Sequence, residues 1–408
     1  MYDVVIVGSG PGGYETAFKL KNLSKSVCLI EKSELGGTCL NRGCIPTKTM
    51  ITAAKRFKEL NSLKRYGITL ENISFDYPVF RKFQKSVISR LRKGLTNSLV
   101  SKGVDLLQGE AKILDDQTII VNEKIKFDNL VIATGSRPFI PKAWKANKKV
   151  IDAEDLWSLE EIPKTIAIIG GGVIGCEYAS MLASLDYKVS LFEKMDTLLS
   201  FEEPEISESI LKELRAQGVT VMLGTTVEID SLEEDLIICA MGRIKNIEGF
   251  EDIIENKNVF LAGDVKGGFQ LAHKAYFDAE QLANIFANKK ISLADSTNIP
   301  AVIFTNPEIS RVGLRAREIT KVKQVKVHFA EVAKAVAENV AKGFILMNIK
   351  EEDNNRIVGM SILGSYAGEL NSTAQLIIKN KMTVNDLKET VFSHPTISEI
   401  FKIAAERV

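Results

Sequence analysis

The feature that most constrains the fold of this chain is an internal repeat of one glycine-rich pattern. The stretch YDVVIVGSGPGGYETAFKL is typical of a strand, a tight turn and a helix, and the strand-like VCLIE follows it. The same order returns in TIAIIGGGVIGCEYASML, which is followed by VSLFE. Three glycines and one glutamate of the first copy recur 162 residues later in the second: Gly8, Gly10, Gly13 and Glu31 as Gly170, Gly172, Gly175 and Glu193.

Each copy has the residues that binding of a dinucleotide requires. The first glycine permits the tight turn, the second lets the backbone approach a pyrophosphate, and the third lets the helix pack closely against the strand. The helix N-terminus offers free N–H groups to the phosphates, and the glutamate accepts hydrogen bonds from a ribose diol. A single copy also occurs in ordinary glycine turns, but two copies in the same context predict two bound dinucleotides.

The position of the repeat predicts the domain organisation. We expect two nested, doubly wound α/β domains, with the first over 1–146 and 250–298 and the second inserted over 147–249. From Ile299 the pattern changes to strand-like segments joined by turns, followed by amphipathic helices. Residues 299–408 are therefore expected to form a separate α+β domain.

Charge and hydropathy exclude several classes of protein. The 408 residues carry 53 basic and 52 acidic side chains, so there is no electrostatic reason to expect nucleic acid or an anionic membrane as a partner. No apolar run approaches the roughly 18 residues that span a bilayer. The strand pattern begins at Tyr2 and leaves no room for a targeting peptide. We expect a cytoplasmic protein.

Two of the five cysteines differ from the others. Cys28, Cys176 and Cys239 have apolar or small neighbours and are expected to be buried in the core. Cys39 and Cys44 lie in the polar segment GGTCLNRGCIPTK, where a close pair in a reducing compartment is more often catalytic or metal-binding than structural. Zinc normally takes four ligands, and the chain has three histidines and no second cysteine pair. We therefore expect no metal, and a disulfide along one or two helical turns that stores two electrons.

The cysteine segment resembles the active-site segment of the flavoprotein disulfide reductases, the class I pyridine nucleotide-disulfide oxidoreductases. The similarity continues along nearly the whole chain, through ATGSRP (133–138), GGGVIGCE (170–177), MGR (241–243), AGDV (262–265), LAHKA (271–275), FTNPE (304–308) and HPTISE (394–399). The resemblance implies FAD in the first domain, a pyridine nucleotide in the second, and a homodimer formed through the third.

The resemblance also implies the roles of the catalytic residues. Cys39 is then the thiol that exchanges with the substrate disulfide, and Cys44 is the thiol beside the flavin. Lys48 lies near flavin N5 and pairs with Glu177, which ties the flavin to the second nucleotide domain.

His394 and Glu399 are implied to complete the site from the partner subunit. The turn at Pro395 permits the carboxylate to face the imidazole and to orient it. The imidazole then takes the proton of Cys39, and the homodimer has shared active sites.

The nucleotide contacts implied by the resemblance are distributed over both domains. The FAD contacts are Gly8, Gly10, Gly13, Glu31, Lys32, Gly37, Thr38, Lys48, Ala111, Thr134, Gly135, Asp264, Leu271, Ala272 and His273. The NAD contacts are Gly170, Gly172, Gly175, Glu193 and Gly242. Asp264 is expected to bond the ribityl chain, and residues 271–273 to open a helix whose dipole stabilises negative charge on the reduced flavin. The imidazole of His273 is expected only to pack.

Within the family, two features point to dihydrolipoamide dehydrogenase. Glu193 would repel the 2′-phosphate of NADP, which glutathione reductase uses, and no arginine follows to receive that phosphate. No cysteine follows Cys239, whereas mercuric reductases and the large thioredoxin reductases need a second redox pair near the C-terminus. The expected reaction is the oxidation of protein-bound dihydrolipoamide by NAD⁺. The expected partners are a lipoylated acyltransferase or a glycine-cleavage H-type protein.

Two alternatives stay open. The chain could be an NADH-dependent reductase of another small disulfide, or a FAD-holding scaffold or regulatory protein with little turnover. The second alternative rests on a deletion: between TTVEID and EEDLIICAMGR the family usually carries a β-meander that is missing here. The deletion puts the outer wall of the NAD cleft, and the affinity for NAD, in question. The sequence decides neither the multienzyme complex served nor the physiological direction.

Overall fold

The first sheet contains the N-terminal copy of the glycine repeat. The structure is a computed structural model that describes residues 1–60, 62–291 and 299–408. Seven strands follow the order β3-β2-β1-β6-β5-β4, with β14 paired to β6, and only β4 and β5 run antiparallel to their neighbours. The strands are β1 (Tyr2–Val7), β2 (Val27–Glu31), β3 (Asp105–Gln108), β4 (Lys112–Asp115), β5 (Thr118–Ile120), β6 (Lys124–Ile132) and β14 (Val259–Leu261).

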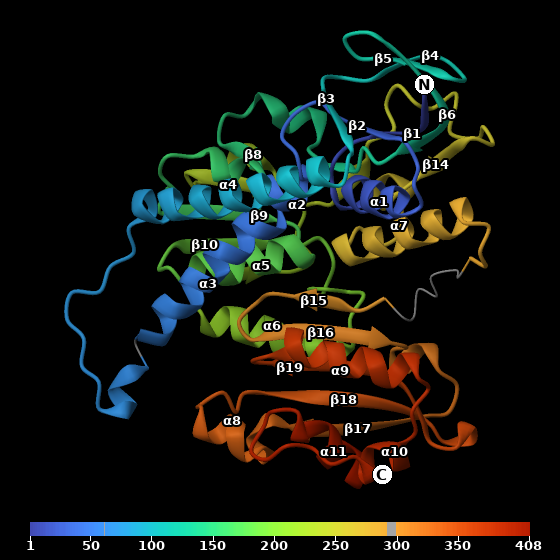
Figure 1. Ribbon diagram of the computed structural model, residues 1–408. Coiled ribbons are helices and arrows are strands. Elements are labelled where there is room, and N and C mark those ends of the chain that lie inside the picture. The colour runs from blue at the N-terminus through green and yellow to red at the C-terminus, as the bar shows by residue number, and fades with distance from the viewer. Residues whose placement is uncertain (61, 292–298) are drawn as a thin grey trace.

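Alternate residues of β1 pack against opposite layers, because successive side chains of a strand point to opposite faces. Val4 and Ile6 contact the layer of helices that includes α1, α4 and α7, whereas Val5 and Val7 contact the other face. α1 and α7 lie side by side (Figure 1). The helices of this half are α1 (Pro11–Asn22), α2 (Gly37–Asn41), α3 (Cys44–Leu60), α4 (Tyr77–Ser101) and α7 (Ala272–Phe286).

The second sheet repeats this architecture with the second glycine turn. Its five strands are all parallel and follow the order β11-β10-β9-β12-β8. An antiparallel ribbon of β7 and β13 lies where the chain passes between the two sheets. The elements are β7 (Ser136–Pro138), β8 (Val150–Asp152), β9 (Thr165–Ile169), α5 (Val173–Ala183), β10 (Lys188–Phe192), α6 (Pro204–Ala216), β11 (Thr220–Met222), β12 (Leu236–Cys239) and β13 (Arg243–Lys245).

The return of the chain to the first sheet at β14 confirms the prediction of nested α/β domains. The exact domain boundaries stay a prediction. Part of one of them, 292–298, lies outside the described residues.

The connection between β11 and β12, which the family resemblance marks as shortened, is brief. Between β11 and β12 the chain forms only a short 3-10 turn, Ile229–Ser231. Ile229 is buried against the sheet, and Val227, Leu232 and Trp144 pack around the same cluster. The shortened connection therefore packs its own apolar side chains against this face of the sheet.

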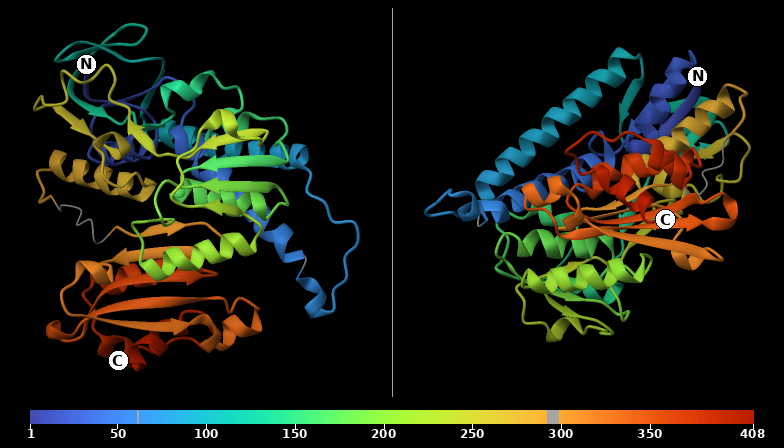
Figure 2. Two further views of the ribbon diagram at one scale, coloured as in Figure 1. Left: turned by 180° about the vertical axis from the view of Figure 1, so that it is seen from behind. Right: turned by 90° about the horizontal axis from the view of Figure 1, so that it is seen from below.

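The C-terminal domain is an antiparallel sheet with helices. In Figure 2 it lies at one end of the molecule, next to α6, and residues of its sheet such as Ile309 and Leu346 share a hydrophobic cluster with the nucleotide domains. Its strands follow the order β15-β16-β19-β18-β17, and its helices share one hydrophobic core with it. The elements are β15 (Ala301–Ile303), β16 (Glu308–Gly313), β17 (Val322–His328), α8 (Ala333–Ala337), β18 (Gly343–Lys350), β19 (Arg356–Gly364), α9 (Ala367–Lys379), α10 (Val384–Glu389) and α11 (Glu399–Glu406).

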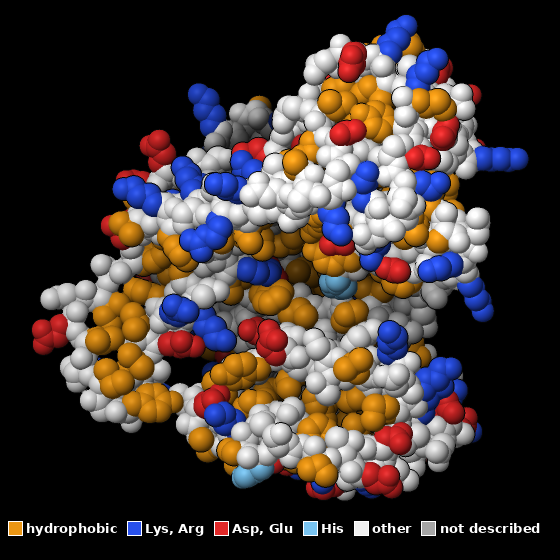
Figure 3. All heavy atoms as spheres, in the orientation of Figure 1, with side chains coloured by type: hydrophobic (Ala, Val, Ile, Leu, Met, Phe, Trp, Pro, Cys, Tyr) orange, Lys and Arg blue, Asp and Glu red, His pale blue; other side chains and the backbone are white. Residues whose placement is uncertain are grey.

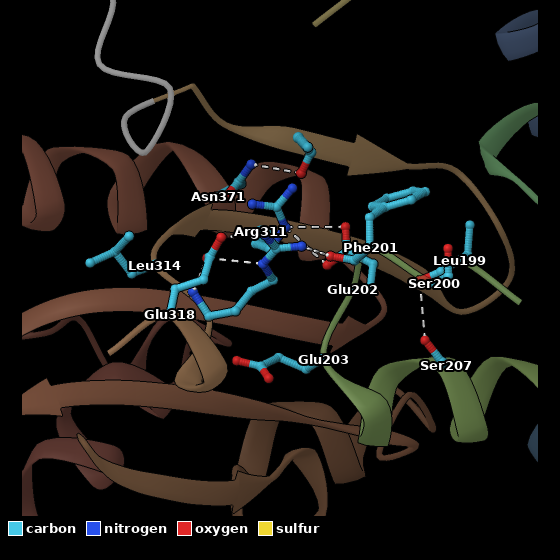
Figure 4. Close-up of polar contacts among 12 residues, drawn as sticks. Leu199, Ser200, Phe201, Glu202, Glu203, Ser207, Arg311, Leu314, Glu318 and Asn371 are labelled. Carbon is cyan, nitrogen blue, oxygen red and sulfur yellow. Dashed lines mark hydrogen bonds and ion pairs between the residues drawn. The ribbon is translucent and has the colours of Figure 1, made fainter. Parts of the chain in front are cut away.

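A buried polar cluster joins the second nucleotide domain to the C-terminal sheet (Figure 4). The guanidinium Nε of Arg311, on β16, donates to both carboxylate oxygens of Glu202 at 3.0 and 3.2 Å. Glu203 accepts from the Ala316 backbone N–H at 2.7 Å and from the Asn348 amide at 3.1 Å. The side chain of Glu202 is 1% exposed, and burial raises its pKa although Arg311 opposes that shift. These contacts therefore join α6 and the segment before it to the C-terminal sheet.

We expect Arg311→Met to destabilise the protein strongly, because it leaves the buried Glu202 carboxylate without its cation. Breaking such a pair costs about 3–5 kcal/mol, whereas replacing both partners by apolar groups costs much less. Thermal unfolding should therefore show a large fall in the midpoint for Arg311→Met. The double variant Glu202→Leu/Arg311→Met should unfold at a higher temperature than the single one. Equal midpoints would show that the pair is solvated in solution.

Candidate active site

Cys39 and Cys44 form a disulfide between two successive helices. Cys39 lies in α2 and Cys44 is the first residue of α3, with their Cα atoms 4.6 Å apart. The helical path is interrupted at Arg42, whose φ is −137°, so the bridge joins a residue of α2 to the first residue of α3. The break arises because the N–H groups of Arg42 and Gly43 both bond to the Thr38 carbonyl, at 2.8 and 2.6 Å, and close the turn there.

The position of Cys44 favours its thiolate. A sulfur at the first residue of a 17-residue helix lies at the positive end of the helix dipole, which stabilises the negative charge. The other three cysteines are buried and free, as predicted. Burial raises the pKa of the Cys28 thiol to about 12, and it raises that of Cys239 as well. The bridged pair is thus the reactive one among the five.

An ion pair ties the disulfide helix to the second nucleotide domain. Lys48 lies one turn after Cys44 on α3, and its Nζ is 2.8 Å from Glu177 Oε2 on α5. The Glu177 side chain is 7% exposed. Its other oxygen, Oε1, accepts from the Phe304 backbone N–H at 2.8 Å. Phe304 was not among the predicted site residues, although the FTNPE segment that contains it was recognised.

The first glycine turn has the shape of a phosphate cradle. A Cβ on Gly13 would be 1.8 Å from the Gly8 carbonyl oxygen, and one on Gly8 would be 2.4 Å from that of Ala133. Both positions therefore require glycine for packing. A Cβ on Gly10 would meet only Gly37 Cα, at 3.9 Å, so the backbone there is open to a ligand. Gly37, in α2, approaches Gly10 so closely that the disulfide lies next to this cradle.

The second turn repeats this geometry. A Cβ on Gly175 would be 1.8 Å from the Gly170 oxygen, whereas Gly172 has nothing within 4 Å. Nothing in the packing of the described chain requires glycine at 172, which leaves a closely bound ligand as the reason for it. Both turns thus fit the two dinucleotides that the sequence predicts.

The glutamates that close the turns are held by the loops themselves. Glu31 accepts from Ser9 N–H at 2.9 Å and from Ser33 N–H at 2.8 Å. Glu193 accepts from Gly171 N–H at 2.5 Å and from Met195 N–H at 2.7 Å. Each Glu193 oxygen keeps lone-pair capacity for a ribose hydroxyl. Each Glu31 oxygen also accepts from a serine hydroxyl, Ser9 Oγ at 2.6 Å and Ser33 Oγ at 3.2 Å, and a ribose hydroxyl would have to replace one of these bonds. The ribose contacts stay a prediction.

Asp264 is oriented by a chain of polar contacts that begins at the inter-domain ribbon. Ser136 Oγ donates to Asp264 Oδ2 at 2.6 Å, and Arg243 Nε donates to Ser136 Oγ at 2.7 Å. Arg243 also pairs with Glu154 at 2.7 Å, and both side chains are nearly buried. The carboxylate expected at the ribityl chain is therefore preset before any ligand binds.

The other predicted FAD residues lie around the first turn and at the start of α7. Lys32 is exposed and pairs with Glu110 at 3.8 Å, with Ala111 next along the chain. Leu271 caps α7, and Ala272 begins it. The Thr134 hydroxyl donates to the Asn246 carbonyl. Gly135, and Gly242 from the predicted NAD contacts, have positive φ and no atom within 4 Å of where a Cβ would project, so the backbone there is open as well.

The expectation for His273 was wrong. Its ring does not merely pack, because Nε2 lies 2.6 Å from the Pro300 carbonyl oxygen. Pro300 precedes β15, so this bond links the start of α7 to the C-terminal domain.

His394 and Glu399 form the expected pair but lie apart from the disulfide. Nδ1 of His394 is 2.9 Å from Glu399 Oε1, and the other carboxylate oxygen accepts from Thr396 N–H at 2.9 Å. These bonds lower the pKa of Glu399, the backbone one most. The His394 side chain is 72% exposed, so the ring edge bearing Nε2 is accessible. α11 lies beyond the C-terminal sheet from α2 and α3 in Figure 1.

The single chain therefore brings together the disulfide, the Lys48–Glu177 pair and the first glycine turn, but not the histidine. In the described part of the chain, no group of three or more metal-binding side chains could hold an ion. No helix among the described residues is long and apolar enough to cross a membrane.

Comparison with known sequences identifies the family. The profile of pyridine nucleotide-disulphide oxidoreductases matches residues 2–279, and that of their dimerisation domain matches 299–405. The chain belongs to the pyridine nucleotide-disulphide oxidoreductases. It is a flavoprotein disulfide oxidoreductase with the redox disulfide Cys39–Cys44, and its cofactors are FAD and NAD(H), as in the family.

Individual oxidoreductases of the family extend the likeness over the whole chain. Dihydrolipoyl dehydrogenase of Geobacillus stearothermophilus is 32% identical over 450 residues, covering 99% of this chain and 95% of that protein. The enzyme of Bacillus subtilis is 30% identical, covering 99% and 96%. The aligned length exceeds the 408 residues here, so these relatives carry segments that this chain lacks.

Solved structures show the same architecture. The HOCl-induced flavoprotein disulfide reductase RclA of Escherichia coli has a TM-score of 0.90 at 26% identity, with both chains fully covered. LpdA of Mycobacterium tuberculosis has a TM-score of 0.91 at 21% identity and shows the fold alone.

The two cysteine substitutions should differ spectroscopically in the oxidoreductase with bound FAD. Cys39→Ser leaves Cys44 free as a thiolate at the helix N-terminus. We expect this thiolate to form a charge-transfer complex with the flavin, which would appear as a long-wavelength absorption band without added reductant. Cys44→Ser should lack that band, and both variants should lose disulfide turnover. Absorption spectra of the purified variants provide the measurement, and a band in Cys44→Ser instead would reverse the two roles.

Proposed function

We propose that the protein is a dihydrolipoyl dehydrogenase, which oxidises protein-bound dihydrolipoamide with NAD⁺. The observation that carries this proposal is the identity of about 30% to dihydrolipoyl dehydrogenases over 98–99% of the chain. Glu193, fixed at the mouth of the second turn, supports NAD over NADP because it would repel a 2′-phosphate.

The chemistry assigned to the chain begins with thiol–disulfide exchange. One thiolate of the substrate attacks Sγ of Cys39, the Cys39–Cys44 bond breaks, and Cys44 leaves as a thiolate stabilised at the N-terminus of α3. The second substrate thiol gives its proton to His394 of the partner subunit and attacks the substrate sulfur of the mixed disulfide. Cys39 then leaves, and the lipoyl disulfide is complete. General-base help of this kind contributes about 10²–10⁴ in rate.

The remaining groups serve the transfer of the two stored electrons. Bound FAD supplies a two-electron acceptor between the cysteine dithiol and NAD⁺. Gly10 and Gly172 would admit the two pyrophosphates, and Asp264 would hold the ribityl chain. Lys48, neutralised by Glu177, would place its ammonium beside the reactive edge of the flavin.

The partners follow from the proposed substrate. A lipoylated acyltransferase or a glycine-cleavage H-type protein would present the dithiol, and a cytoplasmic location fits a thiol catalyst in a reducing compartment. The dimerisation domain supports a homodimer.

Apolar side chains also gather on the segment that protrudes between α3 and α4, at the left of Figure 3, with Tyr66 52% and Ile68 48% exposed. Such surface suits a subunit contact.

A second candidate is the reduction of another small disulfide by NADH. The observation in its favour is the likeness to RclA, whose whole chain superposes on this one. A scaffold with little turnover is disfavoured by the intact disulfide, the Lys48–Glu177 pair and the His394–Glu399 pair.

Steady-state turnover distinguishes these functions. We expect oxidation of dihydrolipoamide with NAD⁺, at a kcat/KM about tenfold or more above that with NADP⁺, because of like-charge repulsion at Glu193. Glu193→Gln should lower the ratio of kcat/KM for NAD⁺ to kcat/KM for NADP⁺, with little change in flavin content. Turnover of another disulfide with NADH but not of dihydrolipoamide would select the second candidate. Absence of any turnover in the FAD-loaded protein would select the scaffold.

Mixed dimers test the shared active site. Chains with Cys44→Ser and chains with His394→Ala should each form nearly inactive homodimers. When they are co-expressed, about half of the dimers are mixed and each has one complete site, so roughly a quarter of the wild-type activity should return.

The matched control replaces the second chain by Cys44→Ser/His394→Ala, which offers no intact cysteine pair and should restore nothing. Activity of the original mixture no higher than that of its parents would mean that the histidine acts within its own chain, or not at all.

A further inference from the structure

The Lys48–Glu177 pair is held by a third group, which comes from the C-terminal domain. Phe304 lies between β15 and β16, and its backbone N–H occupies the Glu177 oxygen that Lys48 leaves free, at 2.8 Å. The carboxylate is 7% exposed and has a donor on each oxygen. Neither oxygen can turn away without breaking a bond, so the carboxylate offers Lys48 one fixed direction.

The ring of Phe304 contacts the same lysine. Nζ of Lys48 lies 4.2 Å from the ring centroid, well inside the distance at which an ammonium is attracted to an aromatic face. A lysine side chain has four flexible carbons, and this one is 32% exposed. The ion pair alone would let it bond Glu177 from several directions. The ring of Phe304 favours the one direction in which the Lys48 ammonium also contacts the aromatic face.

The Phe304 segment is anchored independently on α5 and α3. Asn306 N–H donates to Ser180 Oγ at 3.0 Å, and Ser180 lies on the same face of α5 as Glu177. Ser180 Oγ in turn donates to Gln217 Oε1 at 3.0 Å. Lys55 on α3 pairs with Glu308 at 3.8 Å. The position of Phe304 is therefore set by contacts that do not involve Lys48.

We propose that Phe304 is a positioning residue that holds the Lys48 ammonium in place beside the flavin. This inference rests on the proposed function, because that proposal places Lys48 at the reactive edge of the flavin. A cation fixed there stabilises the negative charge of the reduced flavin. The C-terminal domain thus influences the flavin equilibrium of its own chain, besides forming the dimer.

The test measures a redox equilibrium rather than turnover. Phe304→Leu keeps the backbone N–H and an apolar side chain but removes the aromatic face. With FAD-loaded protein at a fixed ratio of NADH to NAD⁺, the ratio of reduced to oxidised flavin should fall about 2- to 10-fold, the range expected for loss of a partly exposed cation–π contact. Phe304→Tyr keeps the aromatic face and should retain the wild-type ratio.

A double-variant cycle separates positioning from a structural role. Lys48→Met should lower the ratio of reduced to oxidised flavin by itself, and Phe304→Leu should add nothing in that background. Equal effects of Phe304→Leu with and without Lys48 would overturn the proposal, since Phe304 would then act on the fold. FAD content and thermal midpoints of all four proteins report the fold separately.

The remaining outcomes separate the two proposals. An unchanged ratio in Phe304→Leu, with a lowered ratio in Lys48→Met, would show that Phe304 has no positioning role and would leave the function of Lys48 standing. An unchanged ratio in Lys48→Met would show that Lys48 does not act on the flavin. Phe304 would then have no ammonium to position there.

Discussion

Both nucleotide domains depend on the same close contact between two glycines. At Gly13 and again at Gly175, a side chain would come within 1.8 Å of the carbonyl oxygen of the first glycine of the turn. No rotamer can relieve that clash, because the obstacle is backbone. The helix that follows must pack against its strand at this point for its N-terminus to face the phosphates. In the first domain Gly37 extends the contact to α2, which carries Cys39. The packing of the first glycine turn therefore determines where the disulfide lies.

Ion pairs then connect helices and strands that belong to different domains. Lys48 and Glu177 connect α3 to α5, and Phe304 connects both to the C-terminal domain. Arg311 and Glu202 form a second junction between the inserted domain and the C-terminal sheet. Since buried charges are costly unless paired, each junction disfavours separation of the domains it joins. These charged junctions add to the hydrophobic cluster that already spans the domains and includes Ile309 and Leu346 of the C-terminal sheet.

The shortened NAD domain keeps what the proposed function requires. The segment between β11 and β12 packs Ile229 onto the sheet, and Trp144 contributes to the same cluster. The turn at Gly172 and the fixed carboxylate of Glu193 are unaffected by the deletion. Because these features are retained, the deletion no longer favours a scaffold without turnover.

The sequence by itself determined the two α/β domains, their nesting and the redox pair. It could do so because glycine turns and the strand–helix alternation are local: each pattern lies within about thirty residues, and backbone sterics dictate its shape. Even so, the sequence did not show that the Thr38 carbonyl closes a turn between the two cysteines and divides α2 from α3. It also assigned the ring of His273 to packing, because nothing local reveals that the Pro300 carbonyl lies beside it.

Apart from the Lys48–Glu177 pair, which the family resemblance implied, only the tertiary structure decided which distant groups meet. The bond from Phe304 N–H to Glu177 joins residues 127 positions apart, and the pair of Arg311 with Glu202 joins residues 109 apart. No periodicity or motif encodes such meetings. They arise from the packing angles of whole domains, which depend on the sum of many side-chain volumes rather than on any one segment. The same reason explains why the single chain leaves His394 away from the cysteines: that distance is a property of the fold, and the shared active site proposed for the homodimer would close it.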